Sequence, residues 1–197
     1  AFLSHYLYVE EKVDGANLGI SFSESGQILL QNRGSYLYPP FSGQWKKLTV
    51  WLNIHQDALF DCLTTEYILF GEWCYAQHSI KYDKLPDWFL AFDIYSVKEE
   101  KFLSPESRNE LLEHTGIAII KEIARGYFSY QELCDLMCRS AYRDDIVEGL
   151  YMRINEGQWL KDRVKLVHPR FIQNIEAHWS QKQLYPNQIY PPFNEIR

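Results

Sequence analysis

Lys12 is the residue of this sequence best suited to covalent chemistry. It follows a strand-like run, Tyr6 to Glu11, and precedes Asp14-Gly15. Aspartate tolerates unusual backbone angles and glycine adopts them freely, so Asp14-Gly15 predicts a tight turn that reverses the chain and lets a ligand approach the backbone. Lys12 would then point into a cleft, where a lysine amine can act as a nucleophile. The alternative interpretation is an ordinary hairpin with a solvated lysine.

Further short motifs follow Lys12 along the chain. In order they are Arg33 in Gln31-Asn32-Arg33-Gly34, Glu72 in Phe70-Gly71-Glu72-Trp73, Phe92-Asp93 in Ala91-Phe92-Asp93-Ile94, Glu148 in Val147-Glu148-Gly149, and Lys165 in Arg163-Val164-Lys165-Leu166. One such fragment is a weak signal, but six in this order between residues 11 and 167 are hard to obtain by chance.

This ordered set resembles the covalent nucleotidyltransferases, the superfamily of polynucleotide ligases and mRNA capping enzymes, which share a Lys-x-x-Gly nucleophile motif. The resemblance implies an α+β fold: a nucleotidyltransferase (adenylation) domain of antiparallel sheets flanked by helices, with ATP in the cleft between them.

Asn17 indicates the branch of the superfamily. DNA ligases and capping enzymes usually have arginine five residues after the nucleophile, whereas RNA ligases of the phage and trypanosome editing type have asparagine. The resemblance is therefore to the ATP-dependent RNA ligases, with a DNA ligase or a GTP-dependent mRNA capping nucleotidyltransferase as the alternatives. Asp14 stands where many of these RNA ligases have histidine, which leaves the exact branch open.

The resemblance implies a role for each motif. Lys12 would attack the α-phosphorus of ATP to give lysyl-AMP, Lys165 would neutralise the α-phosphate, and Glu148 would help to hold Mg²⁺ or Mn²⁺. Glu72 and Arg33 would contact the ribose. The residues expected to bind the nucleotide are Glu11, Asn17, Arg33, Glu72, Phe92, Arg163 and Lys165.

The nucleophilic amine must be neutral, but a free lysine with a pKa near 10.4 is almost fully protonated at pH 7. Nearby cations disfavour a further positive charge, and Lys165, Arg163 and a bound Mg²⁺ would supply them.

Each motif residue also has a purely structural interpretation. Phe92 is expected to stack on adenine, yet it lies in an apolar strand and is equally suited to the core. Phe89 is its local rival, on the other face of a regular strand. Asp93 is expected to hold the strand rather than to touch ATP. A nucleotide- or RNA-binding module that has lost the chemistry is a further alternative, against which the intact Lys12 and Glu148 argue.

Turn residues and apolar spacing outline the elements. Strands are predicted at 6–11, 16–22, 27–31, 67–74, 88–96 and on both sides of Asn155-Glu156-Gly157, and helices at 44–62, from Ser104-Pro105 to Gly116, from a Ser129/Glu132 capping box, and at 169–179.

Two hairpin registers follow from these turns. A loop at Ser23–Gly26 would put Arg33 opposite Ala16 and return it to the nucleophile. A turn centred on Glu156-Gly157 would put Glu148 opposite Lys165, with Arg163 and Lys161 along the same face. A slip of one residue would move these side chains to the other face.

Composition is that of a folded enzyme. The 197 residues are 46% hydrophobic and 16% aromatic, which excludes disorder, and no apolar run is long enough to cross a membrane. No signal peptide is evident, so we expect a cytoplasmic protein with reduced cysteines. The net charge of -6 predicts modest RNA affinity, carried by a local basic cleft near Lys161, Arg163, Lys165 and Arg170.

The organisation expected from the sequence is a single nucleotidyltransferase domain over residues 1–197. The motifs nearly fill the chain, which fits either a domain excised from a longer protein or a very small ligase. Only 32 residues follow Lys165, so the oligonucleotide-binding barrel that normally follows this domain in DNA ligases and capping enzymes is not expected. The expected partners are RNA ends or nicks and ATP, with no membrane, and a flanking domain would supply specificity.

Overall fold

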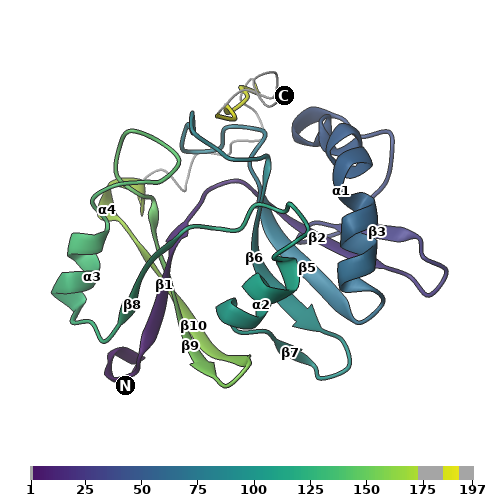
Figure 1. Cartoon of the computed structure of the whole chain (residues 1–197). Helices are drawn as coiled ribbons and strands as arrows, with labels where there is room; N and C mark the ends of the chain where they lie inside the picture. Colours follow the sequence, from purple (N-terminus) through teal and green to yellow (C-terminus); the bar gives the residue numbers. More distant parts are fainter. Residues whose placement is uncertain (1, 173–183, 191–197) are drawn as a thin grey trace.

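Two antiparallel sheets stand side by side and form the body of the protein (Figure 1). The computed structural model describes residues 2–172 and 184–190, and the fold is described for these residues. The α+β class and the antiparallel sheets predicted from the sequence are confirmed.

The first sheet contains the predicted nucleophile strand. Its order is β10-β9-β1-β8, with β1 at Leu7–Lys12, β8 at Glu122–Gly126, β9 at Gly149–Glu156 and β10 at Trp159–Val167. Because β1 lies between β9 and β8, almost all of it is buried. Successive side chains of a strand point to opposite faces, so Leu7 and Val9 pack in one core while Glu10 and Lys12 face the second sheet.

The second sheet carries the middle motifs. Its order is β4-β3-β2-β5-β6-β7, with β2 at Ala16–Phe22, β3 at Ile28–Gln31, β4 at Tyr36–Leu37, β5 at Tyr67–Trp73, β6 at Phe89–Ser96 and β7 at Lys101–Phe102. Its apolar face is covered by α1, Leu48–Leu63, whose Trp51, Leu52 and Leu59 share a core with Leu18 and Leu69 (Figure 1).

The remaining helices are shorter. They are η1 at Phe2–Ser4, η2 at Gly43–Trp45, α2 at Pro105–Leu112, α3 at Tyr130–Leu136 and α4 at Pro169–Ile172. Leu133 of α3 packs in the core with Leu7 and Val9 of β1. The Ser129/Glu132 capping box is present, and the Ser104 hydroxyl accepts from Ser107 N–H at the start of α2. The predicted helix at 169–179 is described only as far as Ile172. No helix in the described part of the chain is long and apolar enough to span a membrane.

The predicted reversal at Asp14-Gly15 is wrong. β1 and β2 belong to different sheets, and the chain crosses from one to the other between them (Figure 1). Gly15 is required for close packing rather than for an unusual backbone angle, because a Cβ there would lie 2.7 Å from the carbonyl oxygen of Trp73 and 3.1 Å from Cγ of Glu72.

Both hairpin registers differ from the predictions. Lys165 pairs with Tyr151 rather than Glu148, because the turn is centred after Glu156 and an irregularity between Leu160 and Asp162 adds a residue to β10. In the β2–β3 hairpin Gly19 pairs with Gln31, one residue away from the predicted register. Turn position alone did not reveal the extra residues.

Replacement of Gly71 by alanine tests the packing of the second sheet. A Cβ at Gly71 would lie 2.3 Å from the buried Phe89 ring and 2.7 Å from the carbonyl oxygen of Leu90, so we expect Gly71→Ala to lower the free energy of unfolding by about 1–3 kcal/mol. Gly34→Ala is the control, since nothing lies within 4 Å of its added Cβ. Chemical denaturation of both variants is the measurement, and equal stabilities would contradict the packing argument.

Candidate active site

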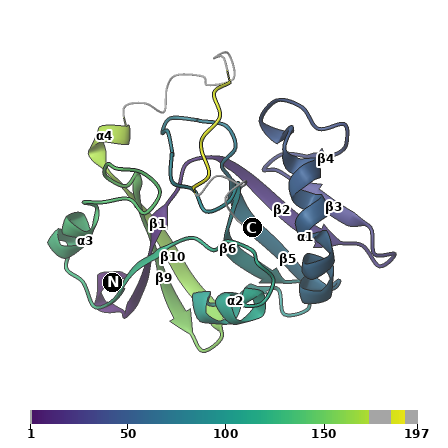
Figure 2. The same cartoon turned by 45° about the horizontal axis from the view of Figure 1, so that its top comes forward.

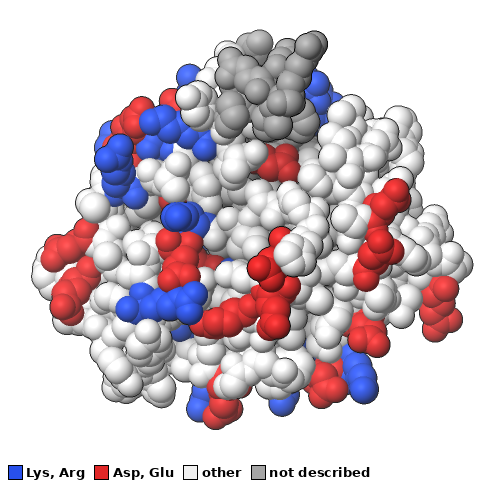
Figure 3. Space-filling model, viewed as in Figure 1, with Lys and Arg blue, Asp and Glu red and all other residues white. Residues whose placement is uncertain are grey.

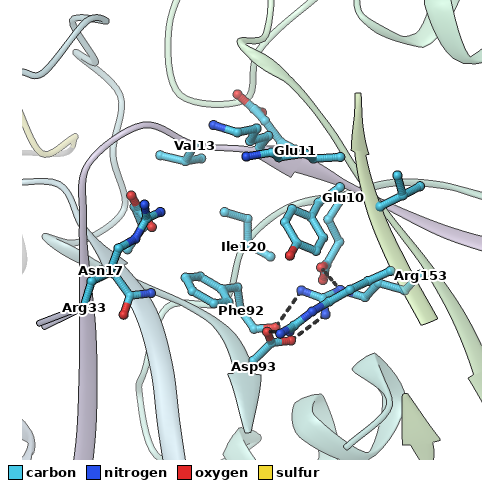
Figure 4. A pocket seen from close by; sticks show the side chains of 15 residues that line it. Glu10, Glu11, Val13, Asn17, Arg33, Phe92, Asp93, Ile120 and Arg153 are labelled. Carbon is cyan, nitrogen blue, oxygen red and sulfur yellow. Dashed lines mark hydrogen bonds and ion pairs between the residues drawn. The ribbon is translucent and has the colours of Figure 1, made fainter. Parts of the chain in front are cut away.

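A pocket of about 530 Å³ opens between the two sheets, and most of the predicted site residues line it. Figure 4 shows the pocket with residues of the first sheet on one side and of the second on the other. The predicted residues that line it are Glu11, Lys12, Asn17, Arg33, Glu72, Phe92, Arg163 and Lys165. Motifs that are far apart in the sequence thus meet at one pocket.

Glu148 and the predicted nucleophile form an ion pair. Nζ of Lys12 lies 2.6 Å from Oε1 and 2.5 Å from Oε2 of Glu148, and both side chains are partly buried. The sequence predicted Glu148 opposite Lys165. In the structure Glu148 instead directly precedes Gly149, which pairs with Lys12 across β1 and β9. Burial raises the pKa of the Glu148 carboxyl above its ordinary value, and the charge of Lys12 opposes this shift.

Of the two phenylalanines of β6, Phe92 lines the pocket and Phe89 does not. Phe89 is fully buried in the core under α1, whereas the Phe92 ring lies in the pocket near Val13 and Ile120 (Figure 4). The pairing of β6 with β5 skips Phe92, so the strand bulges there. The bulge lets two consecutive residues, Phe92 and Asp93, face the pocket. The apolar slot fits a planar base.

Asn17, Arg33 and Glu72 form the polar wall on the second sheet. Asn17 pairs with Glu72 across β2 and β5, and Arg33 follows β3 (Figure 4). One carboxylate oxygen of Glu72 accepts from Gly15 N–H at 2.9 Å. Burial raises the pKa of Glu72 from 4.5 to about 7, against the opposing charge of Lys12. Glu72 is therefore part of the pocket wall rather than a solvated surface residue.

Arg163 and Lys165 project from β10 into the pocket. Arg163 forms an ion pair with Asp93 and lies over the ring of Phe102. Lys165 lies near enough to Glu148 to lower its pKa. Asp93 thus binds the side chains of Arg153 and Arg163.

The other basic residues of the predicted cleft lie elsewhere. Lys161 pairs with Glu156 near the hairpin tip, and Arg170 lies 3.5 Å from Asp145. Basic side chains do gather around Asp144 and Asp145, and Figure 3 shows such a group at the upper left, on the side where α4 lies. Its members are Lys84, Arg139, Arg143 and Arg170.

The side chain of Glu11 points away from Lys12. Its carboxylate accepts from the Ser140 hydroxyl at 2.5 Å and from Ala141 N–H at 2.8 Å, in the loop after α3. Burial raises the pKa of Glu11, and these two hydrogen bonds oppose the shift. Glu11 borders the pocket but holds the strand in place.

A group of paired charges at the pocket was not predicted from the sequence. Glu10 accepts from Arg153 at 2.8 Å, and Arg153 also donates to Asp93 at 2.5 Å (Figure 4). Glu10 also accepts from Arg108 at 2.6 Å. Both arginines donate to the carbonyl oxygen of Phe92. The sequence did offer a signal for this group: Glu10 and Arg153 are charged residues inside apolar strands. Buried charges require partners, so such residues indicate ion pairs.

The pocket suits a metal ion that takes some of its ligands from the protein and the others from a bound nucleotide. Glu148 offers carboxylate oxygens, the type of ligand that Mg²⁺ and Mn²⁺ prefer. No group of three or more acidic, histidine or cysteine side chains able to hold a metal occurs among residues 2–172 and 184–190. The remaining ligands would come from phosphate and water, as is usual for Mg²⁺ bound with nucleotides.

Comparisons with known proteins agree with this fold. A structure of Naegleria gruberi RNA ligase with PPi has 18% identity and a TM-score of 0.68, covering 88% of this chain and 52% of that one. A variant of that ligase with AMP and Mn has 16% identity and a TM-score of 0.67, covering 86% and 52%. A variant with ATP and Mn has 15% identity and a TM-score of 0.63, covering 86% and 51%. The chain thus spans about half the length of these solved structures.

A lysine at the end of a strand, paired with a carboxylate and facing an apolar slot between two antiparallel sheets, defines the nucleotidyltransferase class. The RNA ligase family model matches residues 5–167, so the chain belongs to the RNA ligase family of that class. No curated protein matches the sequence.

The raised pKa of Glu72 predicts a pH-dependent stability. Between pH 4.5 and about 7 the folded protein keeps the Glu72 proton that the unfolded chain releases, so stability falls as pH rises through this window. The Glu72→Gln variant is the control, because the glutamine side chain stays uncharged at every pH. We expect the stability difference, wild type minus Glu72→Gln, to fall with rising pH by up to about 1.4 kcal/mol per unit in the window. Urea denaturation at several pH values measures this difference, and a flat profile would contradict it.

Proposed function

We propose that this protein is an ATP-dependent RNA ligase that forms a covalent lysyl-AMP intermediate at Lys12. The observation that carries the proposal is that Lys12, which contacts Glu148, lines one pocket together with Lys165, Phe92 and Glu72. Membership in the RNA ligase family favours this function over a DNA ligase or a capping enzyme.

The first step would transfer AMP to the protein. Nζ of Lys12 attacks the α-phosphorus of ATP, an N–P bond forms, the P–O bond to pyrophosphate breaks, and a proton leaves Nζ. Glu148 accepts hydrogen bonds from Nζ, and its raised pKa makes it a suitable acceptor for that proton. Lys165 faces the same space and would stabilise the charge on the α-phosphate.

The adenosine of ATP would lie in the rest of the pocket. The Phe92 ring would stack on adenine, with Val13 and Ile120 bordering the apolar slot. Glu72, Arg33 and Asn17 would contact the ribose and phosphates from the second sheet. With the adenosine held there, pyrophosphate would have to lie opposite Nζ, since in-line alignment is the main requirement of phosphoryl transfer.

A divalent cation, Mg²⁺ or Mn²⁺, would be held by Glu148 together with phosphate oxygens and would neutralise phosphate charge. Nζ of Lys12 contacts both carboxylate oxygens of Glu148, so cation binding would require Nζ to give up one of these two contacts. The other oxygen would still accept from Nζ.

The later steps would act on RNA ends or nicks. An oxygen of the RNA 5′-phosphate attacks the phosphorus of lysyl-AMP and releases Lys12, and the 3′-hydroxyl then attacks the activated 5′-phosphate and releases AMP. The basic group around Asp144 and Asp145 would offer positive charge to the RNA backbone. Because the net charge is -6, we propose that a flanking domain adds affinity and specificity.

We place the protein in the cytosol. Its four cysteines are unpaired in the structure, and the cytosol keeps thiols reduced.

Incubation with ATP or GTP labelled at the α-phosphate, followed by denaturing electrophoresis, tests the chemistry. We expect label on the protein from ATP in the presence of Mg²⁺ or Mn²⁺. Label from GTP alone would favour a capping enzyme, and absence of label from either nucleotide would contradict the proposal.

Removal of the amine tests the nucleophile. Lys12→Ala should abolish labelling, because no other lysine contacts Glu148 in the described part of the chain. We expect this variant to stay folded. Lys161→Ala is the matched control, since Lys161 is half-exposed and pairs only with Glu156 near the hairpin tip. Label retained by Lys12→Ala would refute the assignment.

The sugar at the reactive end tests the RNA preference. The 2′-hydroxyl is the group by which a protein distinguishes RNA from DNA, and an RNA ligase must sense it at the 3′ side of a nick. We expect sealing of a nick with ribonucleotides on its 3′-OH side and poor sealing when those sugars are deoxyribose. The test uses the full-length protein and gel separation of ligated product. Equal sealing of both nicks would favour a DNA ligase.

A further inference from the structure

Residues 184–190, here called the strap, bind the loop between β5 and β6, residues 74–88. Figure 2 shows this yellow segment lying along the loop at the top of the molecule. Pro186 bridges to Ala76, and Ile189 bridges to Leu85. Two isolated β-bridges, one to each limb of the loop, therefore hold the strap in place.

Asn187 is the only fully buried residue of the strap, with 2% of its surface exposed. Its side-chain Nδ2 donates to the carbonyl oxygens of Cys74 at 2.9 Å and Ala76 at 3.3 Å, and Oδ1 accepts from Tyr82 N–H at 2.8 Å. Its backbone N–H donates to the Tyr75 carbonyl at 2.9 Å. One side chain thus joins the two limbs of the loop.

The same loop holds the segment after the nucleophile. The hydroxyl of Tyr82 accepts from Asp14 N–H at 3.0 Å, and Ser79 N–H donates to Oδ2 of Asp14 at 2.7 Å. Asp14 departs from the histidine that many related ligases have, and here its side chain ties the crossing between the sheets to the β5–β6 loop.

Lys12 is therefore fixed from both sides. Before it, Glu11 is bound by Ser140 and Ala141. After it, Asp14 is bound by Ser79 and Tyr82. Reacting groups must be held close to their productive geometry, and a small displacement caused by a distant change lowers the rate strongly.

We propose that Asn187 is a positioning residue for the nucleophile and that the strap, by locking the β5–β6 loop through Asn187, holds Asp14 and hence Lys12 in place for attack on ATP. This inference rests on the proposed function. Lys12 is the only one of these residues that would touch the reacting atoms. The strap acts through a continuous path of hydrogen bonds, one of the kinds of network that can carry coupling between sites.

The test compares Asn187→Ala with Gln188→Ala in the full chain. Gln188 is an exposed neighbour on the strap, and its bonds to Tyr82 and Leu85 come from the backbone. Single-turnover formation of lysyl-AMP is measured over a range of ATP concentrations. We expect Asn187→Ala to lower the maximal rate by about tenfold to a hundredfold. The ATP concentration for half-maximal rate should stay within about twofold, because Phe92 and Arg33 are untouched, and Gln188→Ala should match the wild type.

A second pair of variants separates positioning from general destabilisation. Asp14→Ala and Asn187→Ala act on the same path, so their double variant should be about as slow as the slower single variant, whereas independent effects would multiply. If Asn187→Ala does not fold, Tyr82→Phe decides, because it removes only the hydroxyl that accepts from Asp14. A folded Asn187→Ala with a wild-type maximal rate, a Tyr82→Phe with a wild-type maximal rate, or multiplying losses would each overturn the proposal.

Hydrogen exchange gives a readout that does not depend on the chemistry. Amides of residues 14–16 should exchange faster in Asn187→Ala than in the wild type or Gln188→Ala, measured by mass spectrometry without ATP. If the wild type forms no adduct, the proposed function fails, and this measurement still decides whether the strap holds the nucleophile segment. Unchanged exchange would overturn the inference.

Discussion

The floor of the pocket depends on a buried group of charges that joins the two sheets. Glu10 from the first sheet and Asp93 from the second are bridged by Arg153, and Arg108 binds Glu10 from α2. Buried charges are costly unless each is paired, and removing one partner of such a pair costs about 3–5 kcal/mol. The group therefore sets the spacing of the sheets and, through both arginines, the position of the Phe92 carbonyl.

The sequence predicted which residues line the pocket better than it predicted the geometry that places them there. Motif order identified Lys12, Glu72, Phe92 and Lys165, because residue types suited to nucleotide chemistry are visible without a structure. Strand alternation also separated Phe89, which faces the core, from Phe92. The path of the chain after Lys12 was not visible, since Asp14-Gly15 has the composition of a turn although it serves as a crossing between sheets.

Strand register and the partners of the buried charges were also not predicted from the sequence. A turn placed one residue later than predicted and an irregularity in β10 together moved Lys165 from Glu148 to Tyr151, and an extra residue of this kind leaves little trace in the alternation of apolar and polar residues. The partners of Arg108 and Arg153 lie far away in the sequence, so composition gave the charges but not their contacts. Secondary structure is local and was largely predicted, whereas the pairing of strands from distant segments was not.

The central position of β1 has a consequence for how the protein is made. This first strand pairs with β8 and β9, which are synthesised only after the whole second sheet has been completed. Contacts between such distant segments form slowly and late in folding. On the ribosome the second sheet can fold before β8 and β9 are synthesised, so β1 lacks both of its neighbouring strands until then. Lys12 therefore meets Glu148 only after residue 148 has been synthesised, and a chain that stops before this point cannot assemble the reactive pair.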